Sequence, residues 1–214
     1  MTFSIVAFDP DLNMIGSAVA SKWTAVGGCV SYFRPGVGIV HIQNHAYAQV
    51  AFRILDHLEQ NPLMDLSQSV DVALQMDRAK EKRQIAIATI DQRLYVHTGA
   101  ECTELYHQKI GENCAVAGNT LVEKDVIDAM TDAFETSTDF PFTERLIRAL
   151  EAGQDRGGDA RGEEAAAVKA YRFSYPIQRS YPLDLRVDNH EKPLEELRRL
   201  YTIFGDNERR FIDE

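Results

Sequence analysis

Two apolar runs joined by a short polar turn open the chain and limit what it can fold into. In residues 2–8 and 14–21, apolar side chains fall on both faces of an extended strand, a pattern typical of strands buried between two layers. Turn-forming aspartate, proline and asparagine residues separate the runs. We therefore expect an antiparallel hairpin in which Thr2 lies opposite Ser21, give or take one position of register.

This pairing places reactive groups at the start of the chain. Thr2 would lie beside the Ser21 hydroxyl, with Lys22 as a near neighbour. If Met1 is removed, Thr2 carries a free α-amine of pKa about 8, which can accept its own hydroxyl proton. A charged Lys22 would lower the pKa of that amine and stabilise the negative charge formed on attack. The alternative is that Thr2 is only a good strand former.

The next segment predicts two further strands, residues 27–33 and 37–42, followed by a helix over residues 46–59. In four up-and-down strands, alternate strand ends meet at one edge of the sheet. That edge would hold Thr2, Ser21, Lys22, Gly27, Gly28, Gln43 and Asn44. The helix would begin there, and its unpaired backbone N–H groups would suit a developing oxyanion.

The rest of the chain repeats this order of strands followed by helices. The predicted strands are residues 83–90, 94–98, 113–117, 165–173 and 183–187. The predicted helices are capped by Asp65, by Thr120 with Glu123, and by Asp139 with Pro141 (closed by Gly153), and the last starts at Pro193. Two strand blocks, each followed by helices, predict an α+β fold: a four-layer α-β-β-α sandwich over residues 1–214 as a single domain.

Composition narrows the partners. The net charge is −10 with no dominant basic patch, which argues against a nucleic-acid partner. No apolar run approaches the ~20 residues that cross a bilayer, and no secretory signal is evident. Three cysteines without paired spacing are typical of reduced thiols. We expect a cytoplasmic protein without a membrane partner or a cofactor, with a homodimer among its possible assemblies.

Other candidate sites have simpler explanations. His41 and His45 are four residues apart, but one falls on a strand and the other near a helix start. The helical geometry of a zinc pair is therefore missing, and we expect no metal site. Cys29 has no positioned base and is more simply a structural thiol.

Charged residues in the second half of the chain leave two interpretations open. They alternate in sign in the loop that follows Gly153 and on the strand predicted at residues 183–187: Asp159, Arg161, Asp184, Arg186 and Asp188. They form either a set of surface salt bridges or the polar rim of a pocket.

Several motifs occur in the order expected of one family: TFSIVAFDP, GSAVASKWTAVGG, PGVGIVHIQ, RQIAIATID, HTGAEC, VAGNTL, GGDARG and DLRVDNH. With them the chain resembles the family called domain of unknown function 1028, which is grouped with the N-terminal nucleophile (Ntn) hydrolases. The resemblance implies the four-layer fold shared with the proteasome β subunit and several amidases.

The resemblance also implies roles for individual residues. Thr2 resembles the nucleophile, and Lys22 or Ser21 its electrostatic support. Backbone donors near Gln43 and Asn44, helped by Asn119, resemble an oxyanion hole. Substrate contacts would fall on Gln43, Asp159 and Arg161. The family has no assigned substrate, so the resemblance implies a mechanism and not a reaction.

The expected function is hydrolysis of a small-molecule or peptide amide by acyl transfer to Thr2 and then to water. One rival is a non-catalytic protein of the Ntn fold that binds a ligand or partner at the same cleft. Another is a metal-dependent hydrolase that uses His41 and His45. Because threonine is small, we expect Met1 to be removable in the cell, with no propeptide to be cut.

Overall fold

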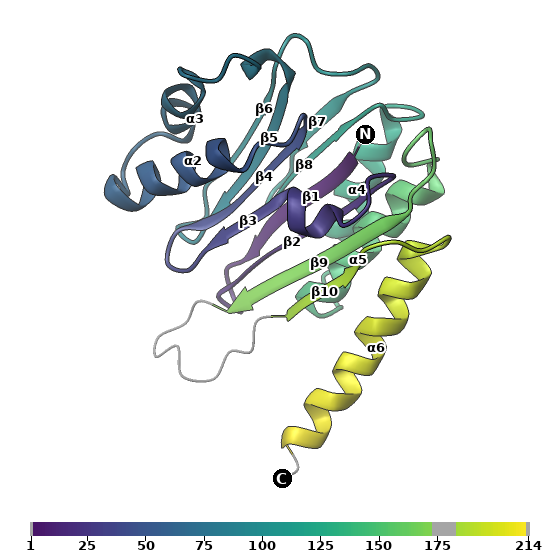
Figure 1. Ribbon diagram of the computed structural model, residues 1–214. Helices are drawn as coiled ribbons and strands as arrows, with labels where there is room; N and C mark the ends of the chain where they lie inside the picture. Colours follow the sequence, from purple (N-terminus) through teal and green to yellow (C-terminus); the bar gives the residue numbers. More distant parts are fainter. Residues whose placement is uncertain (1, 173–182, 213–214) are drawn as a thin grey trace.

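The computed structural model describes residues 2–172 and 183–212. Two antiparallel sheets are packed between layers of helices (Figure 1). The elements in chain order are β1 (Thr2–Asp9), β2 (Met14–Ser21), α1 (Val26–Cys29), β3 (Ser31–Arg34), β4 (Gly38–Asn44), α2 (Ala48–Gln60), α3 (Leu66–Leu74), η1 (Lys80–Lys82), β5 (Arg83–Thr89), β6 (Leu94–Thr98), β7 (His107–Ile110), β8 (Cys114–Asn119), α4 (Asp125–Thr136), α5 (Phe142–Asp155), β9 (Ala165–Arg172), β10 (Leu183–Val187) and α6 (Pro193–Ile212).

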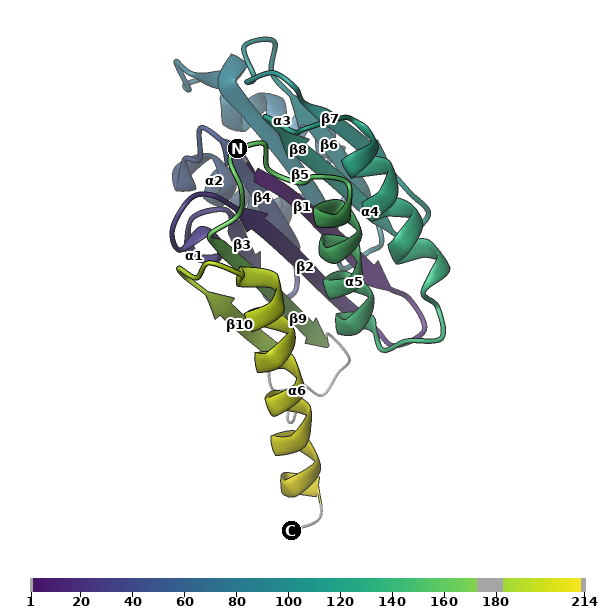
Figure 2. The same cartoon turned by 90° about the vertical axis from the view of Figure 1, so that its right-hand side faces the viewer.

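The layers follow from the order of the strands. The six-stranded sheet has the order β10-β9-β2-β1-β8-β7, and the four-stranded sheet has the order β3-β4-β5-β6. Helices α4, α5 and α6 lie outside the first sheet, and α2 and α3 lie outside the second (Figure 1 and Figure 2). The predicted α+β fold, a four-layer α-β-β-α sandwich, is confirmed.

The hairpin register is also as predicted, with Phe3 paired to Ala20 along β1 and β2. Successive side chains of β1 point to opposite layers. Phe3 and Ile5 enter the core beneath α4 and α5, whereas Val6 and Phe8 enter the core between the two sheets. A strand with both faces buried therefore needs apolar residues at nearly every position.

The residues predicted as a strand at 27–33 fold differently. Residues 26–29 form the short helix α1, and β3 starts only at Ser31. A Cβ added at Gly27 would lie 2.4 Å from the Cβ of Ala167, so the lack of a side chain lets this turn pack directly against β9. Strands β3 and β4 also belong to the second sheet, so the predicted single four-stranded sheet edge is wrong. The ends of two facing sheets meet there instead.

Helix caps were predicted with mixed success. Asp65 caps α3 and accepts a hydrogen bond from the Ser67 N–H, as predicted. The capping box of Thr120 and Glu123 is wrong, because Thr120 has a left-handed φ of 50° and α4 starts at Asp125. Helix α5 continues past Gly153 to Asp155.

One strand of the structure has no counterpart among the predicted elements. Strand β7 was not predicted, since its residues are only half-buried and its sequence alternates weakly. The predicted end of the strand at Phe173 lies outside the described residues. Among the described helices, none combines the length and the apolar character needed to cross a membrane.

Candidate functional site

Thr2 lies at the start of β1, between β2 and β8 in the middle of the larger sheet. Its side chain faces the space between the two sheets, because it shares a strand face with Ser4 and Val6. Thr2 is 5% exposed, and its Oγ1 donates a hydrogen bond to Ser21 Oγ at 3.3 Å. Ser21 Oγ also accepts the Trp23 N–H at 3.0 Å. The structure thus brings Thr2 and Ser21 together.

Lys22 is directed elsewhere. Its ammonium pairs with the Glu164 carboxylate, and both side chains are well exposed, at 40% and 37%. Its backbone N–H donates to Asp159 Oδ2 at 3.0 Å. Within the described residues, Lys22 makes no hydrogen bond to Thr2. The countercharge of its ammonium group is the Glu164 carboxylate.

Asp159 and Arg161, predicted as substrate contacts, are joined to each other. The Asp159 side chain is fully buried, and it accepts the Arg161 N–H at 2.8 Å and the guanidinium at 3.4 Å. Because Asp159 also holds the Lys22 backbone, it fastens the loop before β9 to the end of β2. This arrangement stabilises the local fold and leaves Arg161, at 47% side-chain exposure, on the rim.

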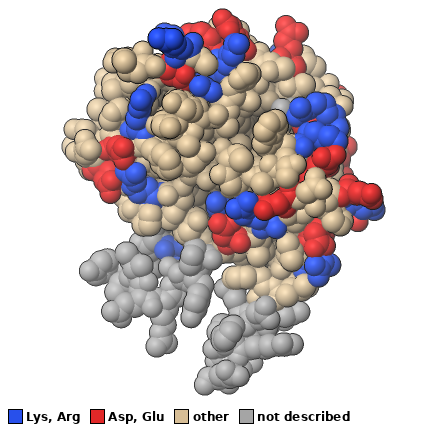
Figure 3. Space-filling view, viewed as in Figure 1, with Lys and Arg blue, Asp and Glu red and all other residues tan. Residues whose placement is uncertain are grey.

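The other alternating charges pair in the same way. Arg186 binds Asp188 at 2.8 Å, and Lys169 binds Asp184 at 3.4 Å. On the face shown in Figure 3, charged side chains gather near the rim and the centre is uncharged. The described contacts favour the surface salt-bridge interpretation, in which each exposed pair contributes at most about 1 kcal/mol.

A buried cluster of polar side chains lies between the sheets beside Thr2. It consists of Ser4, Gln43, Gln84 and Asn119, which we call the amide cluster. Gln43 Oε1 accepts from Ser4 Oγ at 2.9 Å, and Gln43 Nε2 donates to Gln84 Oε1 at 2.9 Å. Asn119 Nδ2 donates to the same Gln84 oxygen at 3.0 Å. All four residues are at most 1% exposed.

Asn44 ends β4 at the same edge. It has a left-handed φ of 68°, which asparagine tolerates better than most residues. Its Nδ2 donates to the Lys82 carbonyl and its Oδ1 accepts from Thr103 Oγ1, each at 2.7 Å. The side chain is therefore fully engaged in holding the neighbouring loops.

The loop between Asn44 and α2 contains three exposed residues, His45, Ala46 and Tyr47. Their N–H groups have no hydrogen-bond acceptor among the described residues. The Arg83 guanidinium donates to the His45 carbonyl and is itself held by Asp77 at 2.7 Å. Donors needed for an oxyanion are thus available where β4 leads into α2.

The histidines do not form a metal pair. His41 is completely buried between the sheets, and neither ring nitrogen has a hydrogen-bond partner among the described residues. Burial, with the charge of Lys169, lowers the pKa of His41 to about 3. His45 is exposed on the loop. In the described part of the chain, no three His, Cys, Asp or Glu residues are grouped to hold a metal ion.

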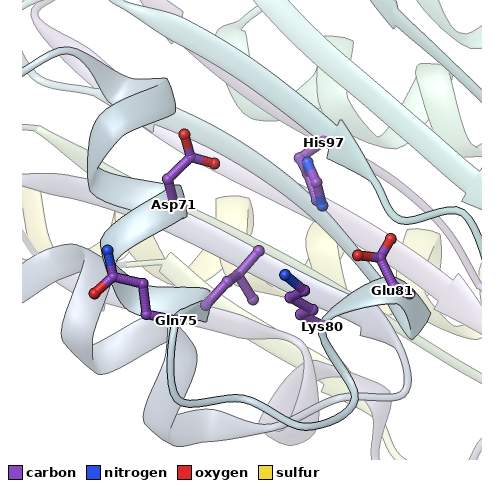
Figure 4. A pocket seen from close by; sticks show the side chains of 6 residues that line it. Asp71, Gln75, Lys80, Glu81 and His97 are labelled. Carbon is purple, nitrogen blue, oxygen red and sulfur yellow. The ribbon is translucent and has the colours of Figure 1, made fainter.

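A hollow of about 280 Å³, which Thr2 does not line, lies between α3, η1 and β6 (Figure 4). It is lined by Asp71, Leu74, Gln75, Lys80, Glu81 and His97. A more open hollow of about 400 Å³ lies at the loop between α2 and α3. Neither hollow is lined by a predicted site residue.

Sequence reasoning missed Ser4, Gln84 and Glu164. The first two are polar residues at inward-facing positions of otherwise apolar strands, and that pattern was a usable signal. Glu164 lies in a polar loop, and nothing in the sequence marks it as the partner of Lys22.

Among solved structures, the chain is similar to the crystal structure of protein SPO2555 from Silicibacter pomeroyi. The TM-score is 0.82 at 28% identity, over 94% of this chain and 88% of that one. Anbu (ancestral beta-subunit) from Yersinia bercovieri matches with a TM-score of 0.42 at 12% identity, over 95% of this chain and 96% of that one. Anbu from Hyphomicrobium sp. strain MC1 matches with a TM-score of 0.43 at 9% identity, over 99% and 97%.

No curated protein matches the chain. The model of a family of unknown function, DUF1028, matches residues 2–197. The Silicibacter pomeroyi protein is assigned to the same family. Because this match spans most of the sequence and the motifs occur throughout it, the chain belongs to the family of unknown function DUF1028.

Proposed function

We propose that the protein is an Ntn-type amidohydrolase whose nucleophile and base are the hydroxyl and the α-amine of Thr2. The observation that carries the proposal is the buried Thr2 hydroxyl at the start of the central strand, hydrogen-bonded to Ser21. A threonine in mid-chain has no amine, so the mechanism requires Thr2 to be the first residue of the working protein. The four-layer α-β-β-α fold, which the sequence motifs lead one to expect of a family grouped with the Ntn hydrolases, supports this assignment.

The reaction is an acyl transfer in two stages. The Thr2 amine accepts the Oγ1 proton while Oγ1 attacks the carbonyl carbon of the amide. The tetrahedral intermediate collapses as the C–N bond breaks, and the leaving nitrogen receives that proton. Water then attacks the Thr2 ester and gives a proton to the amine. The ester C–O bond breaks, the acid leaves, and Oγ1 regains its proton.

Two groups assist in this scheme. Ser21 Oγ, 3.3 Å from Thr2 Oγ1, holds the nucleophile in place. The N–H groups of His45, Ala46 and Tyr47 are the donors for the oxyanion, because these residues are exposed and their N–H groups bond no described residue. Losing one such donor typically slows acyl transfer by about 100-fold or more.

The proposal is tested by covalent labelling of mature protein, whose first residue is Thr2, with an electrophilic β-lactone. A panel of N-acyl and peptide amides is screened in parallel. Wild-type protein should gain one adduct on Thr2, Thr2→Ser should be labelled more slowly, and Thr2→Ala should not be labelled. The melting temperature of Thr2→Ala should stay within about 5 °C, since one partly satisfied hydroxyl contributes about 1 kcal/mol.

Thr89→Ala is the matched control. Thr89 is also a buried strand threonine, at 2% exposure, but its hydroxyl binds the Arg93 carbonyl at the far end of β5. This variant should be labelled as fast as the wild type. Labelling or turnover that persists in a folded Thr2→Ala protein would rule out the mechanism and favour a non-catalytic ligand-binding role.

A further inference from the structure

Asn119 has a buried oxygen that lacks a hydrogen-bond donor. The residue is 0% exposed, and its Oδ1 accepts no hydrogen bond from any described residue. Burying an acceptor without a donor is unfavourable, and such groups in folded proteins call for an explanation. Asn119 lies directly opposite Thr2 in the pairing of β1 with β8.

The orientation of the Asn119 carboxamide follows from backbone groups whose chemistry is fixed. Gln84 Nε2 lies 3.0 Å from the Gly118 carbonyl, so that atom must be the donor and Gln84 Oε1 must be an acceptor. Gln43 Nε2 is fixed in the same way by the Ala117 carbonyl at 3.1 Å. Gln84 Oε1 can therefore only accept, and the Asn119 atom that it meets at 3.0 Å must be Nδ2.

These hydrogen bonds determine which side-chain atom of Asn119 still needs a partner. One of the two Nδ2 hydrogens is taken by Gln84, and among the described residues no donor bonds the acceptor Oδ1. The atom that still needs a partner is thus an acceptor, which cannot itself stabilise an oxyanion. It suits a positively charged or N–H-bearing neighbour.

The backbone nitrogen of Thr2 is directed toward the same strand. The Phe8 N–H donates to the Asn113 carbonyl at 3.0 Å, so that pair is hydrogen-bonded. Such pairs alternate along an antiparallel ladder, and Thr2 is an even number of residues from Phe8 in an unbroken register. The Thr2 nitrogen therefore points to β8, away from β2, and its acceptor in the ladder is the main-chain carbonyl of Asn119.

We propose that Asn119 is the positioning residue of the N-terminal amine: in the mature chain one N–H of Thr2 bonds the Asn119 main-chain carbonyl, and a second, which only the free amine has, is accepted by Asn119 Oδ1. This bond holds the amine so that its lone pair can turn toward Oγ1. The inference rests on the proposed function in one respect, the removal of Met1, which creates the amine. Because an acceptor favours the protonated form, Asn119 raises the pKa of that amine above the value it would have without this contact.

Charged groups on the surrounding segments are largely paired with one another. The pairs are Lys22 with Glu164, Arg161 with Asp159, Arg83 with Asp77, Lys82 with Glu101, and His107 with Asp128. Glu104 and Tyr106 also lie on the loop between β6 and β7, and burial raises the pKa of the Cys102 thiol there to about 11. Among the described residues of β8, Asn119 carries the buried acceptor without a donor, and it lies opposite Thr2.

The test measures the pKa of the amine directly, without a substrate. Mature protein labelled with ¹³C-threonine is titrated by NMR, and the Thr2 resonances report the amine. In Asn119→Leu the pKa should fall by about 0.5–1 unit, and in Asn119→Asp it should rise by about 1 unit or more because the acceptor becomes charged. Asn113→Leu, the same change at the residue that precedes β8, should leave the pKa of the amine unchanged.

The outcomes separate the two proposals. An amine pKa that does not move in Asn119→Leu overturns the inference even if Thr2 is labelled, and a shift without any labelling or turnover refutes the proposed function alone. If Asn119→Leu does not fold, the near-isosteric Asn119→Asp decides, and an unchanged pKa there overturns the inference. A raised KM with an unmoved acidic limb of kcat/KM would assign Oδ1 to the substrate instead. A wild type without a titrating Thr2 amine overturns both.

Discussion

His41 shows how a single residue makes the fold sensitive to pH. Burial lowers its pKa from 6.5 to about 3, so the folded state holds it neutral. Below pH 6.5 the unfolded chain binds a proton that the folded chain rejects, and stability therefore falls as the pH drops toward 3. Between pH 7 and 4.5 this residue alone should cost about 2–3 kcal/mol, because each pKa unit corresponds to 1.36 kcal/mol.

Urea unfolding of the wild type and His41→Leu at pH 7 and at pH 4.5 measures that cost. Between pH 7 and pH 4.5, the free energy of unfolding of the variant should fall by about 2 kcal/mol less than that of the wild type. His45→Leu, which removes an exposed histidine nearby, serves as the control and should decline like the wild type. Parallel declines for wild type and His41→Leu would contradict the burial of a neutral His41.

Single residues also mark the limit of sequence reasoning at the site. The pairing of Thr2 with Ser21 follows from local alternation and a short turn, so it was predictable. The acceptor role of Asn119 depends on Gln84, which lies on the other sheet, and on carbonyl groups of its own strand. The partner of Lys22 depends on where the loop before β9 returns to β2. Contacts set by tertiary packing carry no local signal.

At the scale of elements, the segment before β5 is held by a buried ion pair. Arg83 binds Asp77 through two nitrogens, at 2.7 and 3.0 Å, and the side chains are only 8% and 5% exposed. A hydrogen bond from Arg83 keeps the pKa of Asp77 below its usual range. Arg83 also holds the His45 carbonyl, so the pair links the start of β5 to the loop before α2.

Asp77→Asn should therefore lower the free energy of unfolding by about 3 kcal/mol, since it leaves a buried guanidinium without its countercharge. Urea unfolding at pH 7 checks the value. Asp91→Asn removes an exposed partner of Arg93 and should change stability by less than about 1 kcal/mol. Equal effects of the two substitutions would show that the buried pair does not anchor the segment.

Elements were predictable where their pattern was local and strong. The hairpins β1–β2 and β5–β6 and the helix α2 follow from regular alternation or helical spacing. The helix α1 could not be predicted, because its form depends on close contacts of Gly27 with Ala167 of β9 and of Gly28 with Arg186 of β10. The assignment of β3 and β4 to a second sheet also depends on long-range pairing with β5.

The whole molecule gathers polar groups at one end of the layer between its sheets. Val6, Phe8 and Ile39 fill the other end, whereas the amide cluster and Thr2 fill this one. Polar side chains from both sheets meet at this end: β1 and β8 belong to the larger sheet, and β4 and β5 to the smaller one. Thr2 is the first residue of β1. The first residue of this buried strand therefore lies among polar side chains and not in the apolar core.

The central claim is that Thr2 works as the first residue of the chain, and one measurement tests it most directly. Protein purified from its native cell is analysed by intact mass before and after β-lactone labelling. We predict that Thr2 is the first residue and that only this form gains the adduct, because an amide nitrogen cannot act as the base. Met1 on nearly all molecules, with undiminished labelling, would contradict the account.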